Sequence, residues 1–125
     1  MDSQRPISPH IQIYKPQVTS VFSIIHRISG VGLIAGTVLL SFGIVSFSFC
    51  PTFFEFYVFF LNSFLGSIVT LGLIFSAYFH LFNGIRHLIW DKGCLMKIKH
   101  VNLSAWLVLL LSLLLTFKTA IGILS

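Results

Sequence analysis

Long stretches of this chain carry no formal charge, and they constrain its fold more than any other feature. The charge-free windows cover residues 28–54, 56–85 and 101–117. A charged side chain near the centre of a membrane-spanning helix costs about 2.5 to 3.5 kcal/mol, so such windows are what a spanning helix requires. Only 9% of the 125 residues are charged, against roughly 25% in a soluble domain. The sequence therefore predicts an all-α membrane protein and excludes a soluble monomer.

Two breaks divide the apolar sequence into three membrane-spanning helices. One is Cys50-Pro51-Thr52, and the other is the polar segment 91–100, which begins with the helix-stop sequence Asp91-Lys92-Gly93. A helix that crosses the hydrocarbon core of about 30 Å uses about 20 residues. We expect the spans at about residues 22–49, 56–88 and 103–124. No room is left for a soluble catalytic domain, so the chain cannot be an enzyme by itself.

The first 20 residues differ from the rest because they are polar and contain Pro6, Pro9 and Pro16. Proline lacks a backbone N–H and disrupts a helix interior. We therefore expect an extended N-terminal arm over residues 1–20, followed by a three-helix membrane anchor over residues 21–125.

The basic residues predict the orientation in the membrane. Of the eight Lys and Arg residues, all except Lys118 lie around the start of the first span or around the loop after the second. The loop after the first span holds only Glu55. The positive-inside rule then places the N-terminus on the matrix or cytoplasmic side and the C-terminus on the opposite side. Basic residues spread thinly between apolar runs also argue against nucleic-acid binding.

A histidine, His80, lies inside the second charge-free window. At 100° per residue, Ser76, Gly84 and His87 share one narrow helical stripe with it. An imidazole can supply an axial nitrogen to haem iron, and the missing side chain of Gly84 would let a flat macrocycle approach the backbone. Alternatively, His80 forms an interhelical hydrogen bond and Gly84 permits close packing. The spacing leaves both interpretations open, and a second histidine ligand would have to come from another polypeptide.

A hydroxyl, a cation and a gap face one way at the start of the first span. They are Ser23, Arg27 and Gly30. A hydroxyl and a fixed guanidinium can hydrogen-bond a quinone carbonyl and stabilise the charge that develops there during reduction. The alternative is a helix N-terminus with a serine cap and an arginine anchor. Both interpretations stay open on spacing alone.

Taken together, three stretches resemble the signature motifs of the succinate dehydrogenase cytochrome b subunits, which are membrane anchors of respiratory complex II. The resemblance extends over nearly the whole chain through Gly93. The stretches are Arg5-Pro-Ile-Ser-Pro-His10-Ile-Gln-Ile-Tyr14-Lys15, Ser23-Ile-Ile-His26-Arg27-Ile-Ser29-Gly30 and His80-x-x-x-Gly84-Ile-Arg86-His87-Leu-Ile-Trp90-Asp91-Lys92-Gly93.

The resemblance implies a subunit that does not itself oxidise succinate. In that family a flavoprotein oxidises succinate, an iron-sulfur subunit passes the electrons to ubiquinone, and two small anchors in the membrane share one haem b. It implies that this chain packs against the second anchor, in a mitochondrial inner membrane or an alphaproteobacterial cytoplasmic membrane.

The resemblance also implies roles for individual residues. His80 matches the axial ligand of the haem iron, and His26 and Arg27 match positions beside the haem propionates. Ser23, Ile24 and Arg27 match the quinone site, with Ile24 as an apolar wall. No role carries over to His87. Apart from the resemblance, the position of Asp91 at the helix stop favours a solvated interfacial carboxylate over a member of a proton or salt-bridge network.

Three other functions compete with this one. The chain could be the anchor of a related fumarate reductase, or a purely structural anchor without a cofactor. It could also be a small proton or ion transporter subunit in which His80 and Arg27 line a path. Transport paths usually need several acidic or polar groups across the bilayer, and the charge-free windows contain no Asp or Glu.

Overall fold

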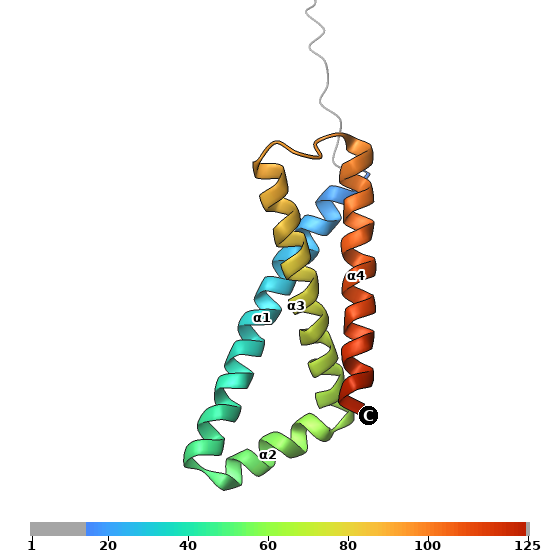
Figure 1. Ribbon diagram of the computed structural model, residues 1–125. Helices are drawn as coiled ribbons and strands as arrows, with labels where there is room; N and C mark the ends of the chain where they lie inside the picture. Colours follow the sequence, from blue (N-terminus) through green and yellow to red (C-terminus); the bar gives the residue numbers. More distant parts are fainter. Residues whose placement is uncertain (1–14, 125) are drawn as a thin grey trace, which may run out of the picture.

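The computed structural model describes residues 15–124, and nearly all of them are helical. The helices are α1 (Val18–Phe49), α2 (Pro51–Asn62), α3 (Phe64–Asp91) and α4 (Ile98–Leu124) (Figure 1). Among the described residues there is no β-strand. Three of the helices, α1, α3 and α4, are long and apolar enough to cross a membrane. The predicted all-α, three-span architecture is confirmed.

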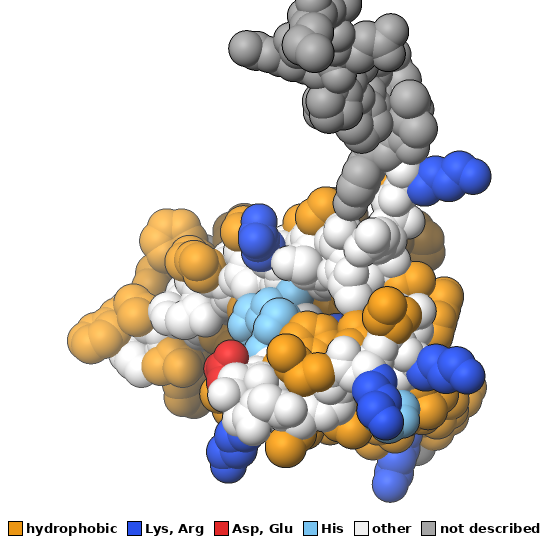
Figure 2. Space-filling model, turned by 90° about the horizontal axis from the view of Figure 1, so that it is seen from above, with side chains coloured by type: hydrophobic (Ala, Val, Ile, Leu, Met, Phe, Trp, Pro, Cys, Tyr) orange, Lys and Arg blue, Asp and Glu red, His pale blue; other side chains and the backbone are white. Residues whose placement is uncertain are grey.

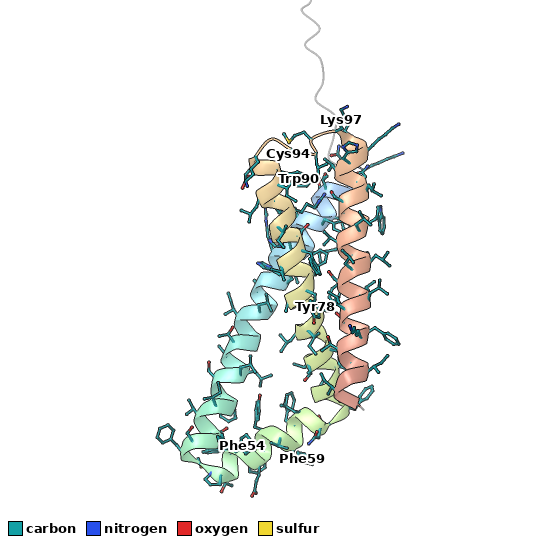
Figure 3. All side chains as sticks on the ribbon, in the orientation of Figure 1. Phe54, Phe59, Tyr78, Trp90, Cys94 and Lys97 are labelled. Atoms are coloured by element: carbon teal, nitrogen blue, oxygen red, sulfur yellow. The ribbon has the colours of Figure 1, made fainter. Side chains whose placement is uncertain are left out.

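The three long helices form an open arrangement. α3 and α4 run side by side, whereas α1 crosses α3 near one end and diverges toward the other, where α2 joins them (Figure 1). The start of α1 and the α3–α4 loop share the first end, and the C-terminus lies at the opposite end. Trp90, Cys94 and Lys97 mark the first end, and Phe54 and Phe59 mark the second (Figure 3). Which end faces the matrix or cytoplasm stays a prediction.

The predicted N-terminal arm falls mostly outside the described residues, which begin at Lys15. Helix α1 begins at Val18, so the last residues of the expected arm already form its first turn.

Helix α1 contacts the other helices along a stripe of mainly small residues. A methyl group built on Gly36 would lie 2.8 Å from Cδ2 of Leu73, and one built on Gly43 would lie 2.6 Å from the ring of Tyr57. Small residues let membrane helices approach closely where no hydrophobic driving force operates between them. The buried residues at seven-residue spacing are Phe22, Ser29, Gly36 and Gly43.

Helix α4 packs on α3 along its own stripe, with a spacing of three and four residues. Its buried positions are Ala105, Val108 and Ser112. Farther along the same stripe of α4, Oγ1 of Thr119 lies 3.0 Å from the hydroxyl oxygen of Tyr78, which belongs to α3 (Figure 3). The sequence predicts this span from its apolar length alone, and the structure shows which of its side chains are buried.

A sharp corner separates α2 from α3, where the sequence analysis drew one span over residues 56–88. Ser63 caps α3 by accepting a hydrogen bond from the backbone N–H of Gly66 at 3.0 Å. A Cβ on Gly66 would overlap the carbonyl oxygen of Phe60 and lie 2.7 Å from Cα of Leu61. The second span therefore begins at Phe64. No charge marks this corner, because a cap and a close backbone approach create it.

The end of α3 matches the predicted helix stop. The helix ends at Asp91, and Gly93 takes a left-handed φ of +73° while its N–H donates to the carbonyl of Trp90 at 2.7 Å. Glycine adopts this conformation without steric cost, which makes it the common residue after a helix C-terminus.

We predict that Gly66→Ala destabilises the corner, because its methyl group forces the α2 backbone away. Overpacking of this kind costs about 1 to 3 kcal/mol. The matched control is Gly72→Ala in the same helix, where an added Cβ meets nothing within 4 Å and alanine favours helix by about 1 kcal/mol. Thermal unfolding of the protein extracted from its membrane should show a lower unfolding temperature for Gly66→Ala and not for Gly72→Ala. Equal stability of the two variants would contradict this account of the corner.

Candidate functional site

Three histidines from two helices come together where α1 crosses α3. The rings of His26 and His80 stack with centroids 4.0 Å apart and planes 15° apart. The centroids of His26 and His87 are 5.6 Å apart. Seen from this end, histidine side chains lie near the middle of the surface, with Lys and Arg side chains around them (Figure 2). The helical stripe predicted His80 and His87 on one face, and the crossing of α1 adds His26.

The ring of His80 is held from one side. Its Nδ1 lies 3.1 Å from Oγ of Ser29 and 3.2 Å from the main-chain carbonyl oxygen of His26. A Cβ on Gly30 would lie 3.1 Å from Cε1 of His80, so the missing side chain leaves room for this ring. The interhelical hydrogen bond considered in the sequence analysis therefore exists, and it engages Nδ1 alone.

The other nitrogen of His80, Nε2, makes no hydrogen bond within residues 15–124. A histidine that binds a metal through one nitrogen commonly uses the other in a hydrogen bond of this kind. One turn along α3, a Cβ on Gly84 would meet no atom within 4 Å, so this face of the helix is open. The free nitrogen and the open face fit a flat macrocycle that carries iron.

The described residues bring together no group of three or more His, Cys, Asp or Glu side chains that could hold a metal ion.

The corner predicted from Ser23, Arg27 and Gly30 is only partly present. Ser23 is half-buried, and Arg27 is exposed one turn farther along α1. Ile24, the predicted apolar wall, is 55% exposed. Gly30 does not supply the gap in this corner, because the ring of His80 occupies the space beside it.

The buried cation at this end is Arg86, which the sequence marks as one of the basic residues that set the orientation and as part of the third motif stretch, with no role of its own. It is 5% exposed, and its Cζ lies 4.0 Å from the centroid of the Trp90 ring. The guanidinium donates hydrogen bonds to Oγ of Ser104 at 2.9 Å, Oδ1 of Asn83 at 3.0 Å and the carbonyl oxygen of Val101 at 2.9 Å.

Arg86 therefore joins α3 to the first turns of α4. Its partners among the described residues are all neutral, so the positive charge is stabilised by oxygen dipoles and an aromatic face. The signal in the sequence was weak: Asn83 precedes Arg86 by three residues, a spacing that places both on one helix face. Nothing in the sequence identified Ser104 as the partner across the loop.

Comparison with known proteins supplies a family likeness over almost the whole chain. Residues 1–119 match the model of a family described as the succinate dehydrogenase/fumarate reductase transmembrane subunit. The chain is 37% identical over 114 residues to the succinate dehydrogenase cytochrome b556 subunit of Rickettsia felis, with 91% of this chain and 89% of the relative covered.

Two eukaryotic relatives are similarly close, and both are named succinate dehydrogenase cytochrome b560 subunit. The one from Marchantia polymorpha is 42% identical over 118 residues, covering 87% of this chain and 83% of the relative. The one from Chondrus crispus is 41% identical over 120 residues, covering 93% and 94%.

We predict that Arg86→Ala loosens the contact between α3 and α4. Each buried acceptor left without a donor costs about 1 to 3 kcal/mol. Arg86→Lys should recover part of the stability, since one ammonium group cannot replace the guanidinium fork. The control is Lys97→Ala in the exposed α3–α4 loop, which should change stability by less than about 0.5 kcal/mol. Thermal unfolding checks the ranking, and an alanine variant as stable as the loop control would contradict it.

Proposed function

The chain belongs to the succinate dehydrogenase/fumarate reductase transmembrane subunit family, and from this we propose that it is the haem b-binding membrane anchor of a succinate dehydrogenase. In that complex it helps form the site where ubiquinone is reduced. A flavoprotein would oxidise succinate, and an iron-sulfur subunit would pass the electrons on. These two proteins and a second small anchor are its proposed partners, and its exposed apolar helices face lipid.

The arrangement of His80 is the observation that carries the proposal. Its Nδ1 is engaged by α1, while Nε2 faces no partner among the described residues, which supports a role as axial ligand of haem iron. Haem b, when bound, supplies a one-electron redox centre. The second anchor would provide the other axial ligand, so the haem would be shared between the two subunits.

Two residues of α1 would hold the haem propionates. Arg27 is an exposed cation with no ion pair within residues 15–124, and a guanidinium binds carboxylates strongly. Nδ1 of His26 is buried and has no hydrogen-bond partner among the described residues, so an added acceptor would satisfy it.

The quinone site would use Ser23 and Arg27, with Ile24 as an apolar wall. The hydroxyl and the guanidinium can both donate hydrogen bonds to a quinone carbonyl, and the cation stabilises the negative charge that develops as the quinone is reduced. Arg27 would thus contact both the quinone and the haem propionates, and it directly follows His26 on α1.

The end that carries these residues would face the mitochondrial matrix or the bacterial cytoplasm. The basic residues around the start of α1 and the α3–α4 loop support this orientation through the positive-inside rule. The soluble subunits would dock on the same end, so that electrons reach the quinone over a short path. The membrane would be a mitochondrial inner membrane or a bacterial cytoplasmic membrane.

A fumarate reductase anchor is the second candidate, because the family description includes it. The relatives reported above carry succinate dehydrogenase names, which favours the first candidate. A transporter subunit has less support, since Glu55 lies in α2 and Asp91 at the end of α3, away from the middle of any span.

We predict that His80→Ala removes the haem b signal. A reduced-minus-oxidised optical spectrum of the purified complex measures it. The matched control is His100→Ala, an exposed histidine at the start of α4, which should leave the spectrum unchanged. If the His80 variant keeps its haem with the native spectrum, His80 is not the ligand.

We predict that Ser23→Ala and Arg27→Ala lower succinate–quinone activity by about ten- to a hundredfold, since a hydrogen bond to a charged group contributes about 1.5 to 3 kcal/mol. Electron transfer from succinate to an artificial dye acceptor should be spared, because the soluble subunits perform it. Lys97→Ala should leave both activities unchanged. Loss of both activities together would indicate an assembly defect and contradict a quinone-site role.

A further inference from the structure

We propose that Ser29 is a positioning residue for the haem ligand: together with the main-chain carbonyl of His26, it fixes the ring orientation and the tautomer of His80, so that Nε2 is the nitrogen presented to iron. This proposal rests on the proposed function, because it takes His80 as the axial ligand. It assigns to the α1 segment 26–30 a task separate from the quinone and propionate contacts.

Three polar atoms form a closed triangle at the crossing of α1 and α3. Oγ of Ser29 donates to the carbonyl oxygen of His26 at 2.7 Å. Nδ1 of His80 lies 3.1 Å from the hydroxyl oxygen and 3.2 Å from the carbonyl oxygen. The proton of the hydroxyl is directed at the carbonyl, so its oxygen offers a lone pair to the imidazole.

This triangle is compatible with one tautomer of His80. A carbonyl oxygen only accepts hydrogen bonds, so the nitrogen opposite it must carry a proton. With the proton on Nδ1, the N–H is shared between the carbonyl of His26 and the hydroxyl of Ser29. The other tautomer would bring a nitrogen lone pair against the carbonyl lone pairs. The Nδ1–H form leaves the lone pair on Nε2, which is the form that a metal ion binds.

The surrounding packing limits how the ring can turn. The ring of His26 stacks on that of His80, and the absent side chain of Gly30 accommodates the Cε1 edge, where a Cβ would lie 3.1 Å away. Ser29 itself is 5% exposed, so water does not replace its hydrogen bonds. The imidazole is therefore bounded on one face, at one edge and at one nitrogen by a single turn of α1.

A buried serine in a helix does not by itself position a side chain of another helix. Ser46 on the same helix is equally buried, at 4% exposure, and also donates to the carbonyl three residues earlier, with Oγ 3.0 Å from the Gly43 oxygen. Within residues 15–124 no imidazole joins that bond. Ser29 differs because a side chain from another helix shares its hydrogen bond, and Ser46 is thus a matched control.

Loss of the Ser29 hydroxyl should change the haem in a defined direction. A hydrogen bond from Nδ1–H makes the imidazole a stronger electron donor and favours ferric iron. Ser29→Ala weakens that bond, so the haem potential should rise. A tenfold change in the preference for ferric over ferrous iron corresponds to about 59 mV for one electron. The ferric low-spin electron paramagnetic resonance signal should shift as well, since it responds to ring orientation.

The test is a potentiometric titration of haem b, with electron paramagnetic resonance spectra, in the purified complex. Ser29→Ala should raise the potential and shift the signal, whereas Ser46→Ala should leave both native. If Ser29→Ala does not assemble, Ser29→Cys keeps a side chain of similar volume with a weaker acceptor, and should change the potential in the same direction. A native potential and a native signal in the assembled Ser29 variant overturn the proposal.

The His80→Ala variant separates this proposal from the one it rests on. If that variant loses haem while the Ser29 variant stays native, only the positioning role fails. If His80→Ala retains haem with its native spectrum, the ligand assignment fails and the positioning role fails with it.

Discussion

The polar contacts that join α3 to α1 and to α4 near the α3–α4 loop are the interactions on which the rest of the structure depends. Lipid tails are as apolar as the helix surfaces, so burial of apolar side chains does little to draw membrane helices together. Close packing of small residues and hydrogen bonds between helices take over that task. His80 meets Ser29 and the His26 carbonyl on α1, and Arg86 meets Ser104 and the Val101 carbonyl on α4.

The histidine and serine contacts that join α1 to α3 lie near one end of the molecule, and this explains its open shape. Near the crossing, α1 is held to α3 by the histidine and serine contacts, and farther along it diverges until α2 bridges the gap (Figure 1). The end at which α1 crosses α3 carries every residue proposed for haem and quinone. A site built on mutually fixed helices holds its side chains more firmly than one built on loops.

The sequence predicted the parts of the fold that depend on the cost of charge in lipid. The three spans and the helix stop at Asp91 both follow from where polar residues do and do not occur. It did not predict the corner at Ser63, because that corner needs a serine cap and a close approach of backbone to Gly66. Neither feature changes charge or hydropathy. The spacing predicts that Gly30 leaves a gap for a ligand, whereas in the structure it makes room for the His80 ring.

The sequence by itself determined that this chain resides in a membrane and how many times it can cross, because the energy of a charge in hydrocarbon depends on residue type and position along a helix. The family motifs are also a property of the sequence alone, because each is a local run of residues. Only the tertiary structure decided which polar side chains meet. Arg86 in the sequence is a basic residue near a helix end, and in the structure it is a buried link to α4. Ser29 is a helical serine until α3 crosses it. Such pairings depend on where two helices cross, and no local pattern in either helix specifies that point.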